Sequence, residues 1–476
     1  MINAGDTAWV LASAALVMLM TPGLAFFYGG MVRSKSVLNM LMMNFICLAV
    51  IGVLWALYGY SWAFGNDAFG GLVGGNEFAG LGKTIGHLVG TASSGPPPVA
   101  WPGPDGLPAT AFVMFQLMFA VITPALISGA IADRVKFWSW TLFVVLWGSL
   151  VYFPVAHWVF SFDGFTGADS KGGWIANILK AEDFAGGTAV HINAGAAGLA
   201  LAIVLGRRKG WRRDPMRPHN LPFVLLGASL LWFGWYGFNA GSALSAGDLA
   251  GVAFTNTTVA TCAAVLGWLL VEQIRDGKPT TLGAASGAVA GLVAITPACG
   301  FVNPLGGIVV GLVAGSVCAL AVGIKFKFGF DDSLDVVGVH LVGGIIGTLL
   351  IGFFGTKSVN SAAVGDDGLF YGGGWTQLGR QAIAAGGVLI YSFVMAFIIG
   401  MVIKKLIGFR IDEEAEVTGI DEAEHAETGY DFSALGGRVS TSIGSHSLES
   451  MNRVSSANTS ANTTAAVPSG TGTKES

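Results

Sequence analysis

The sequence predicts an all-α polytopic membrane protein. Of its 476 residues 53% are hydrophobic and only 11% are charged, whereas a soluble protein carries about 25% charged residues. Eleven apolar runs reach the length of about 20 residues that a helix needs to cross a bilayer. Glycine is frequent, with 71 residues, and small residues let membrane helices pack closely. Together these observations exclude an ordinary soluble enzyme or a nucleic-acid-binding module.

The apolar runs follow one another with short polar connections. The segment before the first run, residues 1–6, has no basic residues, so we expect that run to be a spanning helix and not a cleaved signal peptide. The expected spans are residues 8–30, 38–64, 110–132, 138–160, 184–206, 220–242, 250–272, 281–299, 301–323, 335–355 and 381–405. Long loops are expected at 66–109, 161–183 and 356–380.

The basic residues predict the orientation of the chain. Seventeen lysines and arginines follow the odd-numbered spans, up to Arg410, and five lie in the other loops. Because loops rich in lysine and arginine remain in the cytoplasm, we expect an outside N-terminus and an inside C-terminus in the cytoplasmic membrane. An odd number of spans agrees with this placement.

Two similar motifs carry ionisable residues into the predicted helices. The first reads D-F-A-G-G-T-A-V-H-I-N-A-G-A-A-G from Asp183 and places His191 eight residues after it. The second places His340 eight residues after Asp332. Valine precedes each histidine, and glycines follow it after four and seven residues. Ionisable residues are costly within a membrane, so both histidines are candidate functional residues.

The repeated motif divides the chain into two halves. It lies in the fifth and the tenth span, which run in opposite directions, so spans 1–5 and 6–10 form an inverted repeat, followed by a long eleventh helix. Such a repeat predicts that His191 and His340 meet near the middle of the membrane. Two unrelated histidines, each bonded to a backbone carbonyl, are the alternative, and the shared spacing argues against it.

Aromatic residues gather near the predicted outer ends of two spans. Phe115 and Phe119 are four residues apart and share a helix face. Trp235 and Ser242 lie one turn before and one turn after Phe238. An aromatic core or interfacial belt is one interpretation. The other is a site for a small cation, because aromatic faces attract cations and a hydroxyl oxygen accepts hydrogen bonds.

Neutral histidines can donate and accept hydrogen bonds and can carry a proton near neutral pH. An apolar pore penalises charge. A small protonatable amine suits both features, as a cation at the mouth and a neutral molecule in the pore. We expect no cofactor, no metal site and no nucleic-acid partner, since the sequence lacks metal-ligand spacing, a phosphate loop and a set of catalytic residues.

Several long motifs together resemble the ammonium transporter (Amt/Mep/Rh) family, and in particular its bacterial Amt members. They are P-G-L-A-F-F-Y-G-G-M-V-R-S-K from Pro22, A-D-R-V-K-F from Ala132, the motif from Asp183, G-F-N-A-G-S-A from Gly237 and D-D-S-L-D-V-V-G-V-H from Asp331. The resemblance covers residues 7–430. It implies a homotrimer in membrane lipid, with one pore per subunit and eleven helices, that takes up ammonium or methylammonium.

The resemblance also implies roles for particular residues. Phe119 and Phe238 look like the stacked outer gate, and His191 and His340 like the twin-histidine pair. Asp183 looks like the aspartate of ammonium recognition and deprotonation. The substrate site is expected at Ser242, Phe119, Phe160 and Trp235. The expected pore-lining residues are Phe27, Tyr28, Trp235 and Val336.

One position departs from the family pattern. Bacterial members often carry tryptophan four residues after an A-H dipeptide, where this chain has Phe160 in A-H-W-V-F. Phenylalanine attracts cations less strongly than tryptophan. We therefore expect a weaker outer site, unless Trp158 or Trp147 substitutes.

The C-terminal part divides into two segments after the membrane domain at 1–408. Residues 409–430 resemble the family's cytoplasmic regulatory segment, which implies a trimeric P-II-type signalling partner, although an acidic run by itself is also typical of a solvated tail. Residues 431–476 are polar and are expected to be disordered. Two alternative functions are an ammonium sensor, although no folded output domain is recognisable after residue 430, and an Rh-like electroneutral channel for ammonia or carbon dioxide.

Overall fold

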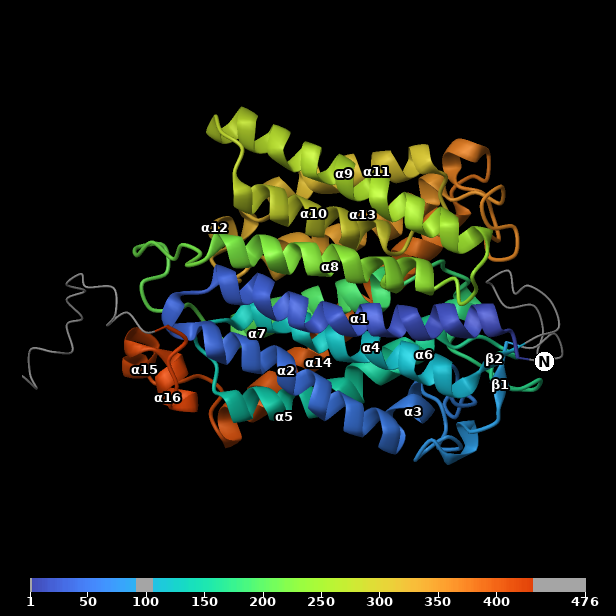
Figure 1. Ribbon diagram of the computed structural model, residues 1–476, viewed down its shortest axis with the longest axis horizontal. Coiled ribbons are helices and arrows are strands. Elements are labelled where there is room, and N and C mark those ends of the chain that lie inside the picture. Colours follow the sequence, from blue (N-terminus) through green and yellow to red (C-terminus); the bar gives the residue numbers. More distant parts are fainter. Residues whose placement is uncertain (1, 91–105, 431–476) are drawn as a thin grey trace, which may run out of the picture. The chain divides into compact units, whose positions relative to one another are not determined.

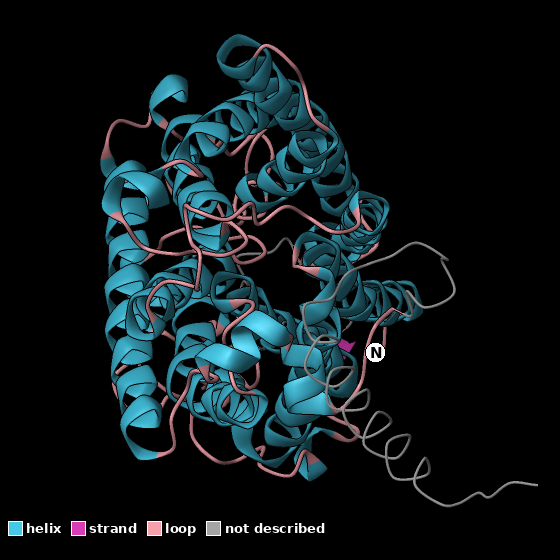
Figure 2. Ribbon diagram, turned by 90° about the vertical axis from the view of Figure 1, so that its left-hand side faces the viewer, coloured by secondary structure: helices cyan, strands magenta, loops and turns pink. Residues whose placement is uncertain are grey.

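The computed structural model describes residues 2–90 and 106–430, and the predicted tail at 431–476 lies outside the described residues. Within the described part, ten helices are long and apolar enough to cross a membrane. Figure 2 views the bundle along its length, so most helices appear end-on. The predicted all-α polytopic class is confirmed.

The described part of the first half contains seven α-helices. They are α1 (Ala4–Met31), α2 (Val37–Leu54), α3 (Tyr60–Phe64), α4 (Ala109–Ser128), α5 (Phe137–Trp147), α6 (Phe153–Phe160) and α7 (Asn193–Leu205). Short π-helical segments join α2 to α3 and α5 to α6, so each pair makes one long span. Two strands of two residues each, β1 (Leu88–Val89) and β2 (Leu107–Pro108), pair antiparallel and precede α4 in the sequence.

The second half and the C-terminal segment, described up to residue 430, contain nine further α-helices. They are α8 (Leu221–Gly241), α9 (Asp248–Asp276), α10 (Thr281–Ile295), α11 (Pro304–Ala321), α12 (Ile324–Phe328), α13 (Val342–Phe354), α14 (Thr376–Leu406), α15 (Glu413–Thr418) and α16 (Ile420–His425). The predicted span at 281–299 corresponds to α10, which has only 15 residues. The total of eleven spans therefore stays a prediction.

Side chains at the helix starts explain several of these boundaries. The side chains of Asn3, Asn220, Thr280 and Asn303 each accept a hydrogen bond from a backbone N–H of the first turn that follows. Such caps satisfy donors that a helix leaves without intrahelical partners. Apolar sequence makes the helices long, and these polar residues determine where they begin.

Burial separates central helices from peripheral ones. In the spans that contain α4 and α7, 89% of the most apolar window is buried, against 44% for α8 and α9. Large apolar side chains of the peripheral helices, such as Phe233, Leu266 and Ile274, are exposed. Exposed apolar surface of this extent is typical of a lipid-facing side, so α4 and α7 lie where a pore would be.

The two halves pack side by side, with α1 against α8 at their boundary (Figure 1). Helices α7 and α13 run antiparallel. Just beyond the end of α7, Arg208 bonds to Asp331 ahead of α13. At the opposite end Glu182, ahead of α7, lies beside Gly355, which directly follows α13. The repeated motifs are therefore inverted relative to each other.

The C-terminal segment packs on the helices rather than extending away from them. The Asp421 carboxylate in α16 accepts hydrogen bonds from the backbone N–H groups of Leu38 and Asn39, at 3.0 and 2.8 Å. It thereby caps α2 from a distant part of the chain. His425 also contacts the Asn39 side chain, at 3.0 Å. Residues up to Gly429 thus belong to the same compact unit as the membrane helices.

Candidate functional site

The aspartates of the two motifs cap the helical segments that carry the histidines. The Asp183 carboxylate accepts hydrogen bonds from the backbone N–H groups of Gly186, Gly187 and Thr188, each at 2.7 Å, and from the Thr188 hydroxyl. Asp332 accepts two backbone hydrogen bonds, at 3.1 and 2.8 Å, from the start of its own segment. Negative charge at a helix N-terminus is stabilised by the helix dipole, so this shared role explains the shared spacing.

The two histidines lie in contact. The Nδ1 atoms of His191 and His340 are 3.4 Å apart, and the two rings are nearly parallel, with centroids 5.4 Å apart. At that distance one Nδ1 donates a hydrogen and the other accepts it. Both rings are almost completely buried. This is the contact that the inverted repeat predicts.

Each histidine lies in a π-helical segment, at Gly187–Ile192 and Val337–Leu341. Such segments are rare and are frequent at functional sites. The extra residue per turn widens the helix locally and shifts the side-chain direction. Both segments have a π-helical turn, and in both the turn carries a histidine at the point of contact. This shared geometry indicates that the two segments form one site together.

Glycines let the two segments approach closely enough for this contact. A Cβ atom at Gly195 would lie 2.5 Å from the backbone nitrogen of Leu341, and one at Gly344 would lie 3.1 Å from the Cβ of His191. A larger side chain at Gly195 would therefore push the segments apart. The glycines at the fourth position after each histidine are thus packing residues.

Aromatic rings cover the histidines on one side. Phe119 and Phe238 have ring centroids 4.3 Å apart, and Phe115 packs edge-on against Phe119 at 4.9 Å. Trp235 stacks on His191 with centroids 5.5 Å apart. A small cavity of about 10 Å³ remains among His191, His340 and their apolar neighbours, close to the smallest volume that holds a water molecule.

A larger cavity of about 690 Å³ lies at the end of the bundle where Asp183 stands. Its walls include the predicted site residues Phe119, Phe160, Asp183 and Ser242. The Ser242 hydroxyl donates to the backbone oxygen of Phe238 at 2.8 Å, which leaves its oxygen lone pairs free for a cation. The structure therefore brings four predicted residues together around one cavity.

Trp235 is placed differently from its expected position in this outer site. It lines the small cavity beside the histidines and does not line the outer one. Its indole N–H donates to the Thr296 hydroxyl at 2.8 Å. Neither Trp147 nor Trp158 lines the outer cavity, and the Trp158 N–H donates to Leu72 O. Neither ring can substitute for tryptophan at Phe160.

The remaining predicted pore residues line neither cavity. Phe27 and Tyr28 are buried, and the Tyr28 hydroxyl donates to Leu126 O at 3.1 Å. Val336 is fully buried and packs near Gly198. Their role as pore-lining residues stays a prediction.

Sequence reasoning missed several walls of the outer cavity. Gln116 and Glu182 line it, together with residues of the loops around 162–181 and 362–365. An acidic residue directly before Asp183 was the available signal for Glu182. The loop residues carried no signal, because their position depends on contacts between distant segments.

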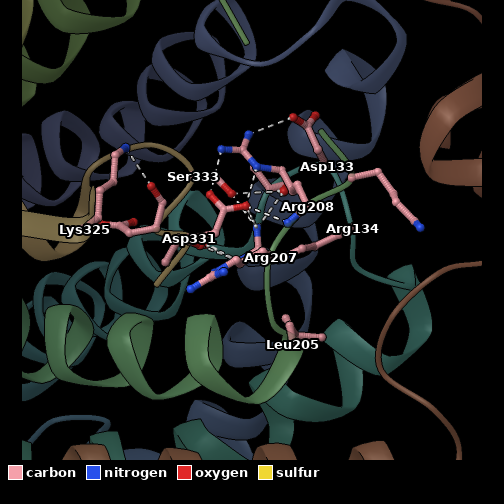
Figure 3. Close-up of polar contacts among 12 residues, drawn as sticks. Asp133, Arg134, Leu205, Arg207, Arg208, Lys325, Asp331 and Ser333 are labelled. Carbon is pink, nitrogen blue, oxygen red and sulfur yellow. Dashed lines mark hydrogen bonds and ion pairs between the residues drawn. The ribbon is translucent and has the colours of Figure 1, made fainter. Parts of the chain in front are cut away.

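At the opposite end of the bundle a buried cluster joins the loops that follow α4, α7 and α12 (Figure 3). Arg208 forms two hydrogen bonds of 2.9 Å to the two oxygens of Asp331 and one of 3.1 Å to Asp133. Arg134 donates to Ser333 Oγ and to Asp331 O, both at 2.6 Å. Burial, the largest single effect, would raise the pKa of Asp331, but the hydrogen bonds from Arg208 and the charges of Arg134 and Arg208 together lower that pKa.

Glu416 of the C-terminal segment lies against the same region. Its two carboxylate oxygens accept hydrogen bonds from Lys209 N and from the Arg410 guanidinium, both at 2.6 Å. Arg33 forms an ion pair with Asp133 at 3.3 Å. The C-terminal segment and the buried cluster are thus joined through neighbouring charged groups.

Comparison with known proteins agrees with these features. Residues 8–430 match the model of the Ammonium Transporter Family. An ammonium transporter of Mycobacterium bovis is 63% identical over 444 residues, which cover 92% of this chain and 92% of that protein.

Solved structures show the same fold. Mep2 of Saccharomyces cerevisiae has a TM-score of 0.78 and 33% sequence identity, covering 91% of this chain and 92% of that chain. A structure described as a sensor Amt protein has a TM-score of 0.77 and 28% identity, covering 88% and 98%. With a family match over nearly the whole described part and a close relative of similar length, the chain belongs to the ammonium transporter family.

Proposed function

We propose that this chain takes up ammonium across the cytoplasmic membrane. The observation that carries the proposal is the contact between His191 and His340 beneath the paired rings of Phe119 and Phe238. A buried imidazole pair offers hydrogen bonds to a small polar molecule in an otherwise apolar passage. The rings above it separate this passage from the outer cavity.

The outer cavity is suited to receive the cation. Phe119 and Phe160 present aromatic faces, which attract a desolvated cation by about 2 kcal/mol or more, and Ser242 presents a hydroxyl oxygen. Ammonium or methylammonium binds here before the passage narrows. Because Asp183 is saturated with hydrogen bonds, it acts through its negative charge and through the segment that it positions.

Passage through the narrow part requires loss of charge, since an ion is costly there. Near Asp183 and the phenylalanine pair one N–H bond of ammonium breaks, and the proton passes to a water molecule of the outer cavity. Ammonia then moves past His191 and His340. The proton follows a separate route, so net transport moves charge.

Features outside the passage support a particular orientation in the membrane, a homotrimeric assembly and regulation from the cytoplasm. The excess of basic residues in one set of loops supports an outside N-terminus and an inside C-terminus. Exposed apolar side chains support contact with lipid and with further copies in a homotrimer. The packed segment at 409–430 supports regulation from the cytoplasm, with a P-II-type protein as its partner.

The current across a solid-supported membrane of proteoliposomes tests substrate and charge movement together. We expect an ammonium pulse to give a current with the wild type and a current at least tenfold smaller with Asp183→Ala, since loss of a buried charge with its hydrogen bonds costs more than about 1.4 kcal/mol. A potassium pulse serves as the control. Ammonia uptake without current would instead support an electroneutral, Rh-like channel.

A second function, ammonium sensing, is favoured by the likeness to the sensor Amt structure. A sensor uses the same binding site but transmits its occupancy through the cytoplasmic segment. Flux distinguishes the two, because a sensor binds ammonium without carrying a sustained current.

A further inference from the structure

The outer cavity contains two adjacent acidic residues with different surroundings. Asp183 has its oxygens saturated by backbone N–H groups and a hydroxyl. Glu182 accepts one long hydrogen bond at Oε1, from Gly365 N at 3.3 Å. Its buried Oε2 atom has no hydrogen-bond partner in the described part of the chain. Of the two carboxyl groups, Glu182 is therefore the one that can still accept a hydrogen or a cation.

Glu182 is held firmly in this position. Its backbone N–H donates to Gln381 Oε1 at 2.7 Å, and Gln381 Nε2 donates to its backbone oxygen at 2.6 Å. The same Nε2 also reaches Thr348 O at 3.1 Å. The residue is thus fixed between the start of the α7 segment, α13 and α14. Only 6% of it is exposed, although it lines the cavity.

The basic group that acts on Glu182 electrostatically is already engaged elsewhere. Arg380 on α14 bonds to the carboxylate of Asp366 at 2.7 Å and to Gln377 at 3.1 Å, and no ion pair to Glu182 occurs among the described residues. Asp366 and Asp367 add negative charge beside it. Further charged residues lining the cavity are Asp163, Lys171, Lys180 and Asp183.

These surroundings oppose the ionised form of Glu182 in an empty cavity. Burial, more than the opposing effects of the Gly365 N–H and of Arg380, raises the pKa of Glu182 to about 8. A buried carboxylate without a partner is costly, and it becomes favourable when a cation lies beside it. The cavity that Glu182 lines is the one in which ammonium is proposed to bind.

We propose that Glu182 is a second cation-attracting carboxyl group of the outer cavity, neutral when the cavity is empty and ionised when a small protonated amine is bound. The inference rests on the proposed function. On binding, the O–H bond at Oε2 breaks, the proton leaves to outside water, and the carboxylate balances the charge of the cation. At neutral pH each binding event therefore exchanges one proton for one cation, and the cation must still lose its own proton before passage.

Linkage between proton and cation gives the direction of the pH effect. Below the pKa of Glu182 the group is protonated and attracts a cation weakly. Above it the carboxylate is present before the cation arrives. The wild-type KM for ammonium should therefore fall as pH rises from about 6 to about 8.5.

The test compares ammonium currents of the wild type and Glu182→Gln, with equal pH on both sides of the membrane. We expect Glu182→Gln to raise KM roughly fivefold at the upper end of the range and to remove its pH dependence, with the maximal current within about twofold of the wild type. Glu182→Asp, which keeps a carboxyl group, should retain the pH dependence. Asp276→Asn makes the same charge change at an exposed, Arg275-paired position outside the cavity and should behave like the wild type.

Proton release gives a second readout that a merely structural role would not affect. Ammonium added to solubilised wild type in weak buffer with a pH indicator should release protons, and it should release none from Glu182→Gln. An identical dependence of KM on pH in wild type and Glu182→Gln would overturn the inference about Glu182. It would not contradict the proposed ammonium transport. If Glu182→Gln does not fold, absence of proton release from the wild type overturns it. A wild type without an ammonium current refutes the proposed function itself.

Discussion

At the scale of residues, the surroundings of His191 and His340 decide what these side chains can do. Each ring is buried, and the Nε2 atom of His191 has no hydrogen-bond partner among the described residues. The Nδ1 atoms are occupied with each other. A free ring nitrogen inside an apolar passage is a hydrogen-bonding position for a small neutral molecule: in one tautomer it accepts a hydrogen bond from an N–H group, and in the other it donates one to a lone pair.

Replacing either histidine by alanine tests this interpretation. We expect His191→Ala and His340→Ala each to lower methylammonium uptake at least tenfold or to lose selectivity, because a lost hydrogen bond in a buried site costs about 1–3 kcal/mol. The effect of each substitution is measured as the uptake of radiolabelled methylammonium into proteoliposomes. His87→Ala, which removes a loop histidine bonded to Thr166 O, is the control. Unchanged uptake and selectivity in both pore variants would contradict the twin-histidine role.

At the scale of elements, two antiparallel segments determine the passage. Each begins at a capping aspartate, contains a π-helical turn with a histidine, and continues as α7 or α13. The buried cluster around Arg208 ties the end of α7 to the start of the second segment. Because the cluster carries several charges in a buried place, its stability depends on all partners being present.

Removing one partner of the cluster should therefore destabilise the protein. Asp331→Asn leaves the Arg208 guanidinium without its bidentate partner. We expect this change to lower the free energy of unfolding by about 3 kcal/mol or more at pH 7. The folded-state pKa of Asp331 is lowered, so its contribution is present above the unfolded pKa of about 3.9 and is lost as pH falls through the folded pKa. The difference in the free energy of unfolding between the wild type and Asp331→Asn should therefore become smaller in strong acid.

Thermal unfolding in detergent across this pH range measures the effect. Asp214→Asn removes an acid that pairs with Arg213 at an exposed site, and surface pairs contribute little. An equal shift in the melting temperature for Asp214→Asn and Asp331→Asn would show that the buried cluster has no special role.

At the scale of the whole molecule, the C-terminal segment is part of the folded body. Asp421 caps α2, and Glu416 bonds beside the Arg208 cluster. The acidic composition of 409–430, typical of a solvated tail, is used here to satisfy backbone N–H groups and basic side chains. Membership of a transporter family also confirms that the chain is not an enzyme.

Truncation measures how much transport depends on this segment. We expect a chain ending at residue 408 to keep an ammonium current with a lower maximal rate, because the start of α2 loses its cap and Lys209 N loses Glu416. Asp421→Ala should reproduce part of the loss, since a cap contributes about 1 kcal/mol. A chain ending at Tyr430 keeps the packed segment and serves as the control. A current unaffected by truncation at 408 would exclude regulation through these contacts.

Much of the fold and part of the site followed from local patterns. Apolar runs predicted ten of the long helices, and the repeat predicted that His191 meets His340. The outer cavity was predicted only in part: Ser242 and Phe160 line it, but Trp235 lies deeper. The direction of the Trp235 side chain depends on which face of α8 packs against the end of α10, where the Thr296 hydroxyl accepts the hydrogen bond of the indole N–H. The spacing of residues within one helix does not specify that face.

The sequence by itself determined the membrane class, the family and the paired motifs, because these depend on composition and on spacings of a few residues. Only the tertiary structure decided that Asp183 is saturated with hydrogen bonds while Glu182, its neighbour, has an open oxygen. It also decided that Asp421 caps α2 and that Arg208 joins Asp331 to Asp133. The physical reason is that hydrogen bonding and burial of a side chain depend on groups far away in the chain, which only the packed helices bring together.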